Sequence, residues 1–315
     1  MYNMLLKETV MGLASNTPVE GLLYIRPYVE KPTSSGSSTY IAGTAFGKGS
    51  IPFKVWQGET FNKMKTEDLS GKICFVKAEV NEFGNSKSII IKDITTDIGE
   101  DCNLGPYDFM ESKYSPEELW TCFWGILKQN TSPEAFAIVE KVIAPVKYNF
   151  EMEFAAVNHH DNCMHGLLAH TSKVVKIAQI VKFYPVIRNT VTMDAIMVGC
   201  ALHDIGKVLE YNNGNISEEG KILNHLTLGL RLIMEHRYDI VNSMGQNFYD
   251  TLLSVVQQHH GQYGERPKTL AAYLVHTFDM LDAKLTDVSE LIENSCSDTI
   301  KVDDFYLRFN KKQEG

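Results

Sequence analysis

A chain of 315 residues is long enough to form two domains. Its composition, with 44% apolar and 22% charged residues, is that of a globular protein and excludes a wholly disordered one. The net charge of −9 argues against a protein that holds nucleic acid across a broad basic face.

The first part of the chain, from about residue 18 to 97, has the pattern of β-strands. Short runs rich in aromatic and β-branched residues are separated by Gly, Ser and Asn turns. These runs are residues 21–25, 40–46, 51–56, 73–80 and 88–91. Five strands in so short a segment predict a small closed β-barrel over residues 1–97, with an OB-like fold favoured and an SH3-like barrel as the alternative.

A polar connector, residues 98–114, separates the barrel from a helical region. Ser115 and Ser132 are each followed by proline and glutamate, which is the pattern of a helix N-terminus. Apolar residues then recur at helical spacing, most clearly over 164–183, 192–209, 222–237, 247–260 and 268–286. The sequence therefore predicts an α+β chain with an all-α bundle over residues 115–300 and a C-terminal tail over residues 301–315.

All ten histidines lie in the helical region, between residues 159 and 276. Several of them stand, with aspartates, beside or inside strongly apolar runs. His203 and Asp204 close the apolar run 195–202, and Asp279 has apolar residues on both sides. Because buried charge needs a charged partner or a metal, these positions are candidate ligands rather than ordinary core residues.

The candidate ligands follow one another on successive predicted helices. They are His170, His203, Asp204, His225, His259, His260 and Asp279. Imidazoles and carboxylates carried on helices can converge inside a bundle, and this donor set suits Mn, Fe, Zn or Co better than Ca or Mg. A carboxylate that bridges two ions about 3.5–4 Å apart would polarise a phosphoryl oxygen and generate a hydroxide nucleophile. His236 and His276 are expected to have ordinary structural roles.

The series His170, His203-Asp204 and Asp279 resembles the signature of the HD superfamily of metal-dependent phosphohydrolases. Longer stretches resemble the YhaM family of 3′–5′ exoribonucleases. These stretches are residues 159–160, 166–171, 202–210, 224–225, 259–261 and 279–284. That family also carries an N-terminal OB-fold domain. The chain departs from the family's pattern at His165 and Ala169, which leaves its choice of substrate open.

The resemblance implies two divalent metal ions that share one carboxylate. The first ion would be held by His170, His203, Asp204 and Asp279. The second ion would be held by Asp204, His225 and one of the pair His259 and His260. Mn²⁺ is the expected ion, with Fe, Co, Zn and Mg as alternatives.

The resemblance also implies contacts with the substrate. Lys207 lies one helical turn beyond Asp204 and would meet a substrate phosphate, so Asp204 and Lys207 are the implied catalytic residues. The alternative for Lys207 is a solvated surface lysine. His160 and His165 are implied contacts with the substrate or with a further metal ion.

Three functions fit this reading of the sequence. The first is a metal-dependent 3′–5′ exonuclease on single-stranded RNA, or alternatively DNA, whose barrel guides the strand by stacking bases on aromatic rings. The second is an HD phosphohydrolase or phosphodiesterase that acts on free or cyclic nucleotides, and the third is a non-catalytic oligonucleotide-binding module. The aromatic candidates, each with a core position as its alternative, are Tyr40, Phe46, Phe53 and Trp56. The lysines beside them are Lys48, Lys54, Lys63 and Lys65.

The cysteines and the apolar runs bear on the compartment. Six cysteines are scattered without a CxxC pair, so reduced thiols in a cytoplasm are expected. The first twenty residues lack the pattern of a signal peptide, and no stretch approaches the roughly 18 apolar residues of a membrane-spanning helix. The expected partner is therefore single-stranded nucleic acid and not a membrane, and homo-oligomer formation is left open.

Overall fold

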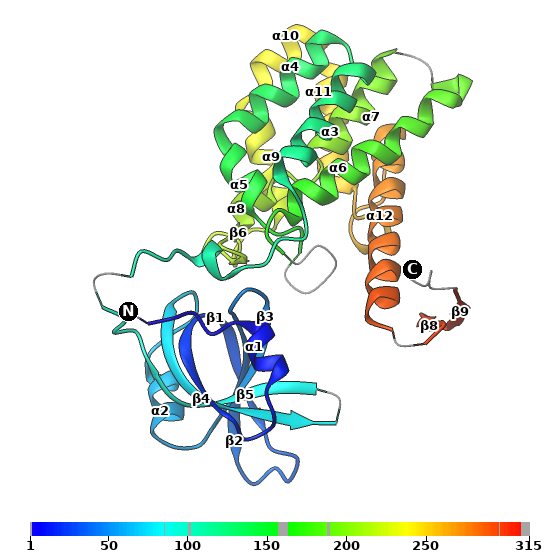
Figure 1. Ribbon diagram of the computed structural model, residues 1–315. Helices are drawn as coiled ribbons and strands as arrows, with labels where there is room; N and C mark the ends of the chain where they lie inside the picture. Colours follow the sequence, from blue (N-terminus) through cyan, green and yellow to red (C-terminus); the bar gives the residue numbers. More distant parts are fainter. Residues whose placement is uncertain are drawn as a thin grey trace. The chain divides into compact units, whose positions relative to one another are not determined.

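The computed structural model describes residues 2–84, 86–99, 102–156, 163–187, 190–295 and 297–309. The chain divides into two compact units, Met1–Ser112 and Lys113–Gly315. The first unit is a β-barrel and the second is a bundle of helices (Figure 1). The predicted α+β fold class, with a barrel followed by helices, is confirmed.

The barrel has the connectivity of an OB-fold. Its strands are β1 (Pro18–Pro32), β2 (Thr39–Phe46), β3 (Ser50–Trp56), β4 (Ile73–Phe83) and β5 (Ser86–Thr95). They close in the order β1-β2-β3-β5-β4, with β3 and β5 parallel and the other neighbouring pairs antiparallel. The helix α2 (Glu59–Thr66) connects β3 to β4. This strand order favours the OB-like prediction over the SH3-like alternative.

Alternating side chains explain how these strands enclose a core. In β3, Ile51, Phe53 and Val55 are buried, whereas Lys54 and Trp56 have the opposite parity and lie on the outer face. The sequence does not predict α2 or the helix α1 (Lys7–Gly12), because helices of eight and six residues carry too few apolar repeats. Phe61 and Met64 of α2 nevertheless join the buried core of the barrel.

The second unit is an all-α bundle with one large apolar core. Its helices are α3 (Pro116–Asn130), α4 (Pro133–Ile143), α5 (Lys147–Met152), α6 (Gly166–Ala178), α7 (Thr190–Leu202), α8 (Lys207–Glu210), α9 (His225–Glu235), α10 (Arg237–Met244), α11 (Gln246–Gln258) and α12 (Leu270–Asn294). Ser115 and Ser132 cap α3 and α4 as the sequence predicts, by accepting backbone N–H groups with their side-chain oxygens. The helix α7 contacts α6, α11 and α12, which explains why it is apolar along its length.

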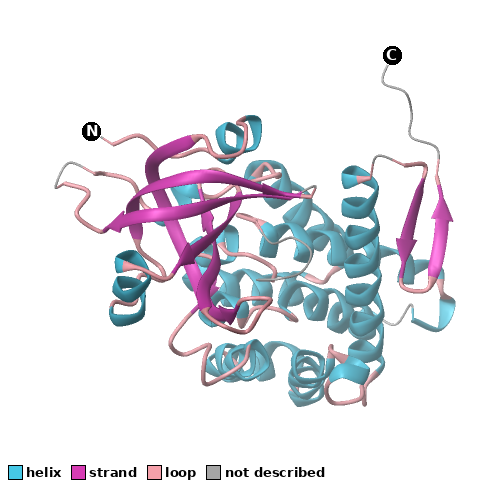
Figure 2. Cartoon of the chain, turned by 90° about the horizontal axis from the view of Figure 1, so that it is seen from below, coloured by secondary structure: helices cyan, strands magenta, loops and turns pink. Residues whose placement is uncertain are grey.

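Two segments differ from the helices and tail that the sequence predicts. The expected helix over 192–209 is interrupted after Leu202 by a turn, and α8 begins at Lys207. Part of the predicted tail forms a hairpin of β8 (Thr299–Val302) and β9 (Phe305–Arg308), with Asp303 at a φ of 51° in its tight turn (Figure 2). Within the described residues, no helix is both long and apolar enough to cross a membrane.

Candidate metal centre

The predicted ligands come together inside the helical unit, around the end of α7. Because α7 is enclosed by other helices, the turn that follows it places His203 and Asp204 in the interior, with 0% and 2% of their surfaces exposed. The other candidates reach this point from four helices or their ends. They are His170 on α6, His225 at the start of α9, His259 and His260 after α11, and Asp279 on α12.

A first cluster consists of His170, His203, Asp204 and Asp279. The Nε2 atoms of His170 and His203 are 3.2 Å apart, and Asp279 Oδ1 lies 3.2 Å from His170 Nε2. Asp204 Oδ2 is 3.5 Å from the Nε2 atoms of both His170 and His203. Two imidazole nitrogens and two carboxylate oxygens therefore face one small volume.

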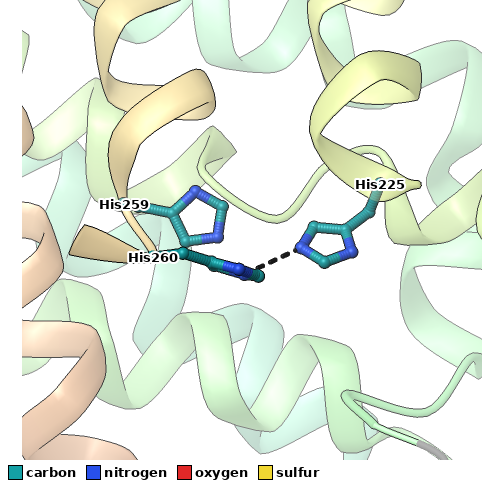
Figure 3. A group of neighbouring side chains, drawn as sticks. All are labelled: His225, His259 and His260. Carbon is teal, nitrogen blue, oxygen red and sulfur yellow. Dashed lines mark hydrogen bonds between the residues drawn. The ribbon is translucent and has the colours of Figure 1, made fainter. Parts of the chain in front are cut away.

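A second cluster lies on the other side of Asp204 and consists of His225, His259 and His260 with that carboxylate. Figure 3 shows the three rings facing one another, with His225 Nε2 3.0 Å from His260 Nε2. Asp204 Oδ1 is 3.4 Å from His259 Nε2 and 3.7 Å from His225 Nε2. The two oxygens of Asp204 thus face different clusters, so this carboxylate could contact an ion in each of them.

The Nδ1 atoms, which lie on the side of each ring away from the cluster, show which tautomer two of these histidines adopt. His203 Nδ1 donates to the carbonyl of Cys200 at 2.9 Å, and His259 Nδ1 donates to the carbonyl of Val256 at 3.0 Å. A carbonyl only accepts hydrogen bonds, so the proton of each neutral ring sits on Nδ1 and the Nε2 lone pair points into its cluster. A metal-ligating imidazole requires this arrangement.

Two more of these histidines are oriented by carboxylates to which the sequence gives no role. His170 Nδ1 lies 2.8 Å from Asp282 Oδ2, and His225 Nδ1 lies 2.9 Å from Glu210 Oε2. Asp282 stands three residues after Asp279 on α12, so helical spacing holds a signal for its place on the same face. Glu210 has no comparable signal, because its contact depends on how α8 and α9 pack.

The protonation equilibria of the buried groups reflect a site that needs a cation. Burial alone would lower the pKa of His170, but hydrogen bonds to Asp279 and Asp282 raise it to about 10. Burial lowers the pKa of His203 to about 4. Burial opposes ionisation of Asp279, yet its hydrogen bond to His170 holds the pKa of this carboxyl below its usual range. Without a metal, a proton on His170 therefore supplies the positive charge that the carboxylates require.

The donor atoms fit divalent metal ions on both sides of Asp204. Asp204 Oδ1 is buried and accepts no hydrogen bond from the described residues. Imidazole Nε2 atoms also lie 3.0 and 3.2 Å apart, so a proton or a cation must lie between the two atoms of each pair. Nitrogen and carboxylate donors in these proportions suit Mn, Fe, Co or Zn. The two clusters can therefore each hold an ion.

Gly206 and Lys207 lie two and three residues after Asp204, at the turn that leads into α8. Lys207 Nζ is 2.6 Å from Asp204 Oδ2, and 13% of its side chain is exposed. Its predicted contact with a substrate phosphate stays a prediction. A Cβ atom on Gly206 would lie 1.9 Å from the carbonyl oxygen of His225, so the absence of a side chain lets the turn approach the start of α9.

Three further histidines occupy other positions. His165 is buried before α6 at a φ of 68°, and its Nδ1 donates to the carbonyl of Glu151 at 2.8 Å. His276 Nδ1 donates to the carbonyl of His259 at 2.6 Å and so supports the backbone that carries two cluster histidines. His160 lies outside the described residues, and its predicted contact with the substrate stays a prediction, as does that of His165.

The structure divides the four aromatic candidates of the barrel into two core residues and two residues on its outer face. Phe46 and Phe53 are core residues, with 5% and 1% of their surfaces exposed. Tyr40 and Trp56 pair across β2 and β3, their ring centroids are 5.0 Å apart, and Trp56 is 45% exposed. Lys54 Nζ lies 5.9 Å from the centre of the Tyr40 ring. The outer face of β2 and β3 thus combines two aromatic rings with a cation.

Comparison with known proteins places both side-chain clusters inside a segment that matches a protein family. The HD domain family model matches residues 167–284, which include every member of both clusters. The 3′–5′ exoribonuclease YhaM of Oceanobacillus iheyensis is 26% identical over 287 residues, covering 87% of this chain and 86% of that protein. The dihydroneopterin 2′,3′-cyclic phosphate phosphodiesterase of Methanocaldococcus jannaschii is 31% identical over 144 residues, covering 43% of this chain and 53% of that protein.

A solved structure is similar to a smaller part of the chain. It is the mitochondrial single-stranded DNA-binding protein Rim1 of S. cerevisiae, at 15% sequence identity and a TM-score of 0.24. The similarity covers 25% of this chain and 94% of that one.

Proposed function

The chain carries an HD domain, and on that premise we propose that it is a metal-dependent 3′–5′ exonuclease that shortens single-stranded nucleic acid, RNA in preference to DNA. The observation that carries the proposal is the position of Asp204, whose two oxygens face two sets of imidazole nitrogens. Two divalent ions, with Mn²⁺ expected, would there polarise a phosphoryl oxygen and lower the pKa of a water molecule for phosphodiester hydrolysis.

The residues of the chain prepare this chemistry in stated ways. The hydrogen bonds at Nδ1 hold the Nε2 atoms of His203 and His259 ready as ligands. Lys207 neutralises Asp204 while no metal is bound. Once cations take over that neutralisation, its ammonium group is free to contact a phosphate oxygen of the substrate. Burial of the clusters keeps these electrostatic interactions strong.

The barrel would supply contact with the strand. Tyr40 and Trp56 offer rings on which bases can stack, with Lys54 beside them for a phosphate. Residues 1–100 contain equal numbers of basic and acidic side chains, so stacking would contribute more than a broad positive field. The preference for RNA follows the YhaM relative, whose name specifies an exoribonuclease and whose similarity extends over most of this chain.

A second candidate function is supported by one specific observation. The relative with 31% identity is named as a phosphodiesterase of a small cyclic phosphate, and its similarity covers 43% of this chain. The same two clusters would serve that reaction, with a free or cyclic nucleotide as the substrate. The two candidates differ in whether the barrel takes part.

One experiment distinguishes them. Purified full-length protein loaded with Mn²⁺ is incubated with 5′-labelled single-stranded RNA, DNA of the same sequence, and a panel of nucleotides that includes 2′,3′-cyclic monophosphates. We expect stepwise shortening of the labelled RNA from its 3′ end. Hydrolysis of the nucleotides alone would overturn the exonuclease proposal in favour of the second candidate.

A matched pair of histidine variants tests the site itself. His203→Ala removes a buried cluster ligand and should abolish hydrolysis, whereas His236→Ala changes a histidine at the end of α9 and should leave it unchanged. Circular dichroism would verify that both variants fold. Full activity in a folded His203→Ala protein would show that the clusters are not the catalytic centre.

A further inference from the structure

Histidines of both clusters are held in place by the same two kinds of hydrogen bond at Nδ1. In each cluster one histidine donates its Nδ1 proton to a backbone carbonyl on its own segment, as His203 and His259 do. A second histidine of each cluster is held by a side-chain carboxylate from another helix. Asp282 on α12 holds His170 on α6, and Glu210 on α8 holds His225 on α9. A carbonyl cannot be altered by substitution, but the two carboxylates can.

We propose that Asp282 and Glu210 are positioning residues, one for each half of the centre, that fix His170 and His225 for binding a divalent cation. The proposal rests on the metal centre of the proposed function. Both carboxylates meet the Nδ1 atom, on the side of the ring away from the Nε2 atom that faces the cluster. They act on the metal through the histidine, by orienting the ring and making Nε2 more basic.

The surroundings of Asp282 fit this role. Only 3% of its side chain is exposed, and a buried carboxylate is costly unless it has partners. Its partners are His170 at 2.8 Å and the ammonium group of Lys173 at 3.5 Å. Lys173 stands three residues after His170 on α6, so one helical face presents both partners to α12. The carboxylate is therefore held in the orientation that accepts the Nδ1 proton of His170.

Glu210 contacts His225 with both oxygens. Oε2 lies 2.9 Å from Nδ1 of the ring, and Oε1 accepts the backbone N–H of the same residue at 3.1 Å. That N–H belongs to the first residue of α9, where backbone donors have no partner within the helix. One carboxylate thus fixes both the start of α9 and the direction of the ring that α9 carries.

Metal affinity, measured one residue at a time, tests the proposal. Mn²⁺ binding to the full chain is followed by isothermal titration calorimetry for Asp282→Ala, Asp282→Asn, Glu210→Ala and Glu210→Gln. Each alanine variant should weaken the affinity for one of the two ions by about 100-fold and leave the affinity for the other unchanged. The amide variants keep an acceptor oxygen without the charge, so they should weaken the same ion by only about tenfold.

Two exposed carboxylates provide matched controls. Glu290 lies on α12 with Asp282 but pairs with Lys113, and Glu219 pairs with Arg231. Glu290→Gln and Glu219→Gln should bind both ions as the wild type does. Excess Mn²⁺ should also restore kcat in the amide variants, which a general loss of structure would not allow.

The outcomes separate this inference from the proposed function. Wild-type affinity for both ions in Asp282→Ala and Glu210→Ala would overturn the inference even if the protein is an active exonuclease. Loss of the same ion in both variants, or a wild type that binds no ion, would overturn it as well. If the wild type binds two ions and the variants each lose one, but no strand or nucleotide is hydrolysed, the inference stands and the proposed function falls. Where an alanine variant does not fold, the amide variant decides.

Discussion

The barrel and the helical unit place their candidate functional groups in opposite environments. In the barrel, inward-facing side chains such as Phe53 form an apolar core, and the aromatic pair Tyr40 and Trp56 lies on the outer face of the sheet. In the helical unit, His203 and Asp204 are buried directly after α7, a helix that contacts α6, α11 and α12. Groups on a surface cost the fold little, whereas buried charges destabilise it unless partners or metals compensate.

This difference predicts that changes in the helical unit affect activity and stability together. Changes on the outer face of the barrel should affect only binding of the strand. The predictions below test that contrast, beginning with the residue that both clusters share.

Substitution of Asp204 should have the largest effect. Asp204→Asn keeps the size of the side chain but removes the charge that faces both clusters. We expect hydrolysis to fall by at least about a thousandfold, equal to about 4 kcal/mol of transition-state stabilisation. Single-turnover kinetics would measure the loss of hydrolysis, and metal analysis of the purified variant would measure the loss of bound ions. A variant that keeps two ions and more than a tenth of the wild-type activity would contradict a shared bridging role.

Removal of metal should destabilise the helical unit and leave the barrel unchanged. A ligand present at 100 times its Kd stabilises the folded state by about 2.7 kcal/mol, which for a unit of this size is a shift in Tm of roughly 5–10 °C. Differential scanning calorimetry with and without a chelator should show the shift in the helical transition alone. Trp56 is the barrel's tryptophan, while Trp120 and Trp124 belong to the helical unit, so fluorescence of a Trp120→Phe/Trp124→Phe variant reports the barrel. An equal shift in both signals would show that the units do not unfold separately.

The contrast between the units also explains what the sequence can predict. His203 and Asp204 are recognisable because charged groups directly after an apolar helix of this length require a special explanation. Glu210 is not, because carboxylates are common on helices and its contact with His225 depends on how α8 and α9 pack. Asp282 has a weaker signal in its helical spacing from Asp279, but its contact with His170 spans 112 residues of chain. The partner of each ligand is therefore identified only by tertiary packing.

In the barrel, the alternation of side chains along a strand predicts the buried face better than the individual residue types do. Phe53 and Trp56 are both aromatic and three positions apart, so in a strand they must face opposite sides. The neighbours Ile51 and Val55 share the parity of Phe53, while Lys54 shares that of Trp56, and this pattern alone identifies the inner face. The short helices α1 and α2 offer no such pattern, and their places depend on contacts with the finished barrel.

Gly206→Ala should damage one cluster through packing alone. The added Cβ would meet the carbonyl oxygen of His225 and the backbone N–H of Gly229, so the turn after α7 and the start of α9 must separate. We expect a loss of about 1–3 kcal/mol in the free energy of unfolding, together with weaker binding of the ion held by the second cluster. Gly125→Ala on α3, where an added Cβ has open space, is the matched control. Chemical denaturation would measure the free energy of unfolding of both variants. Equal stability would contradict the close approach of Gly206 to the start of α9.

Trp56→Ala should have the smallest effect, and it isolates the contribution of the barrel. Because Trp56 is 45% exposed and packs against Tyr40 outside the core, its removal should leave Tm and metal binding unchanged. Loss of one stacking ring should weaken binding of a single-stranded oligonucleotide by about tenfold, or about 1.4 kcal/mol, with kcat preserved at saturating strand. Hydrolysis of a dinucleotide, which offers no extended strand for the barrel to bind, should not change. If the variant loses activity equally on the dinucleotide and on a long strand, the aromatic pair affects the folding of the chain and not the binding of its substrate. That result would contradict the assignment of strand binding to the barrel and of hydrolysis to the helical unit.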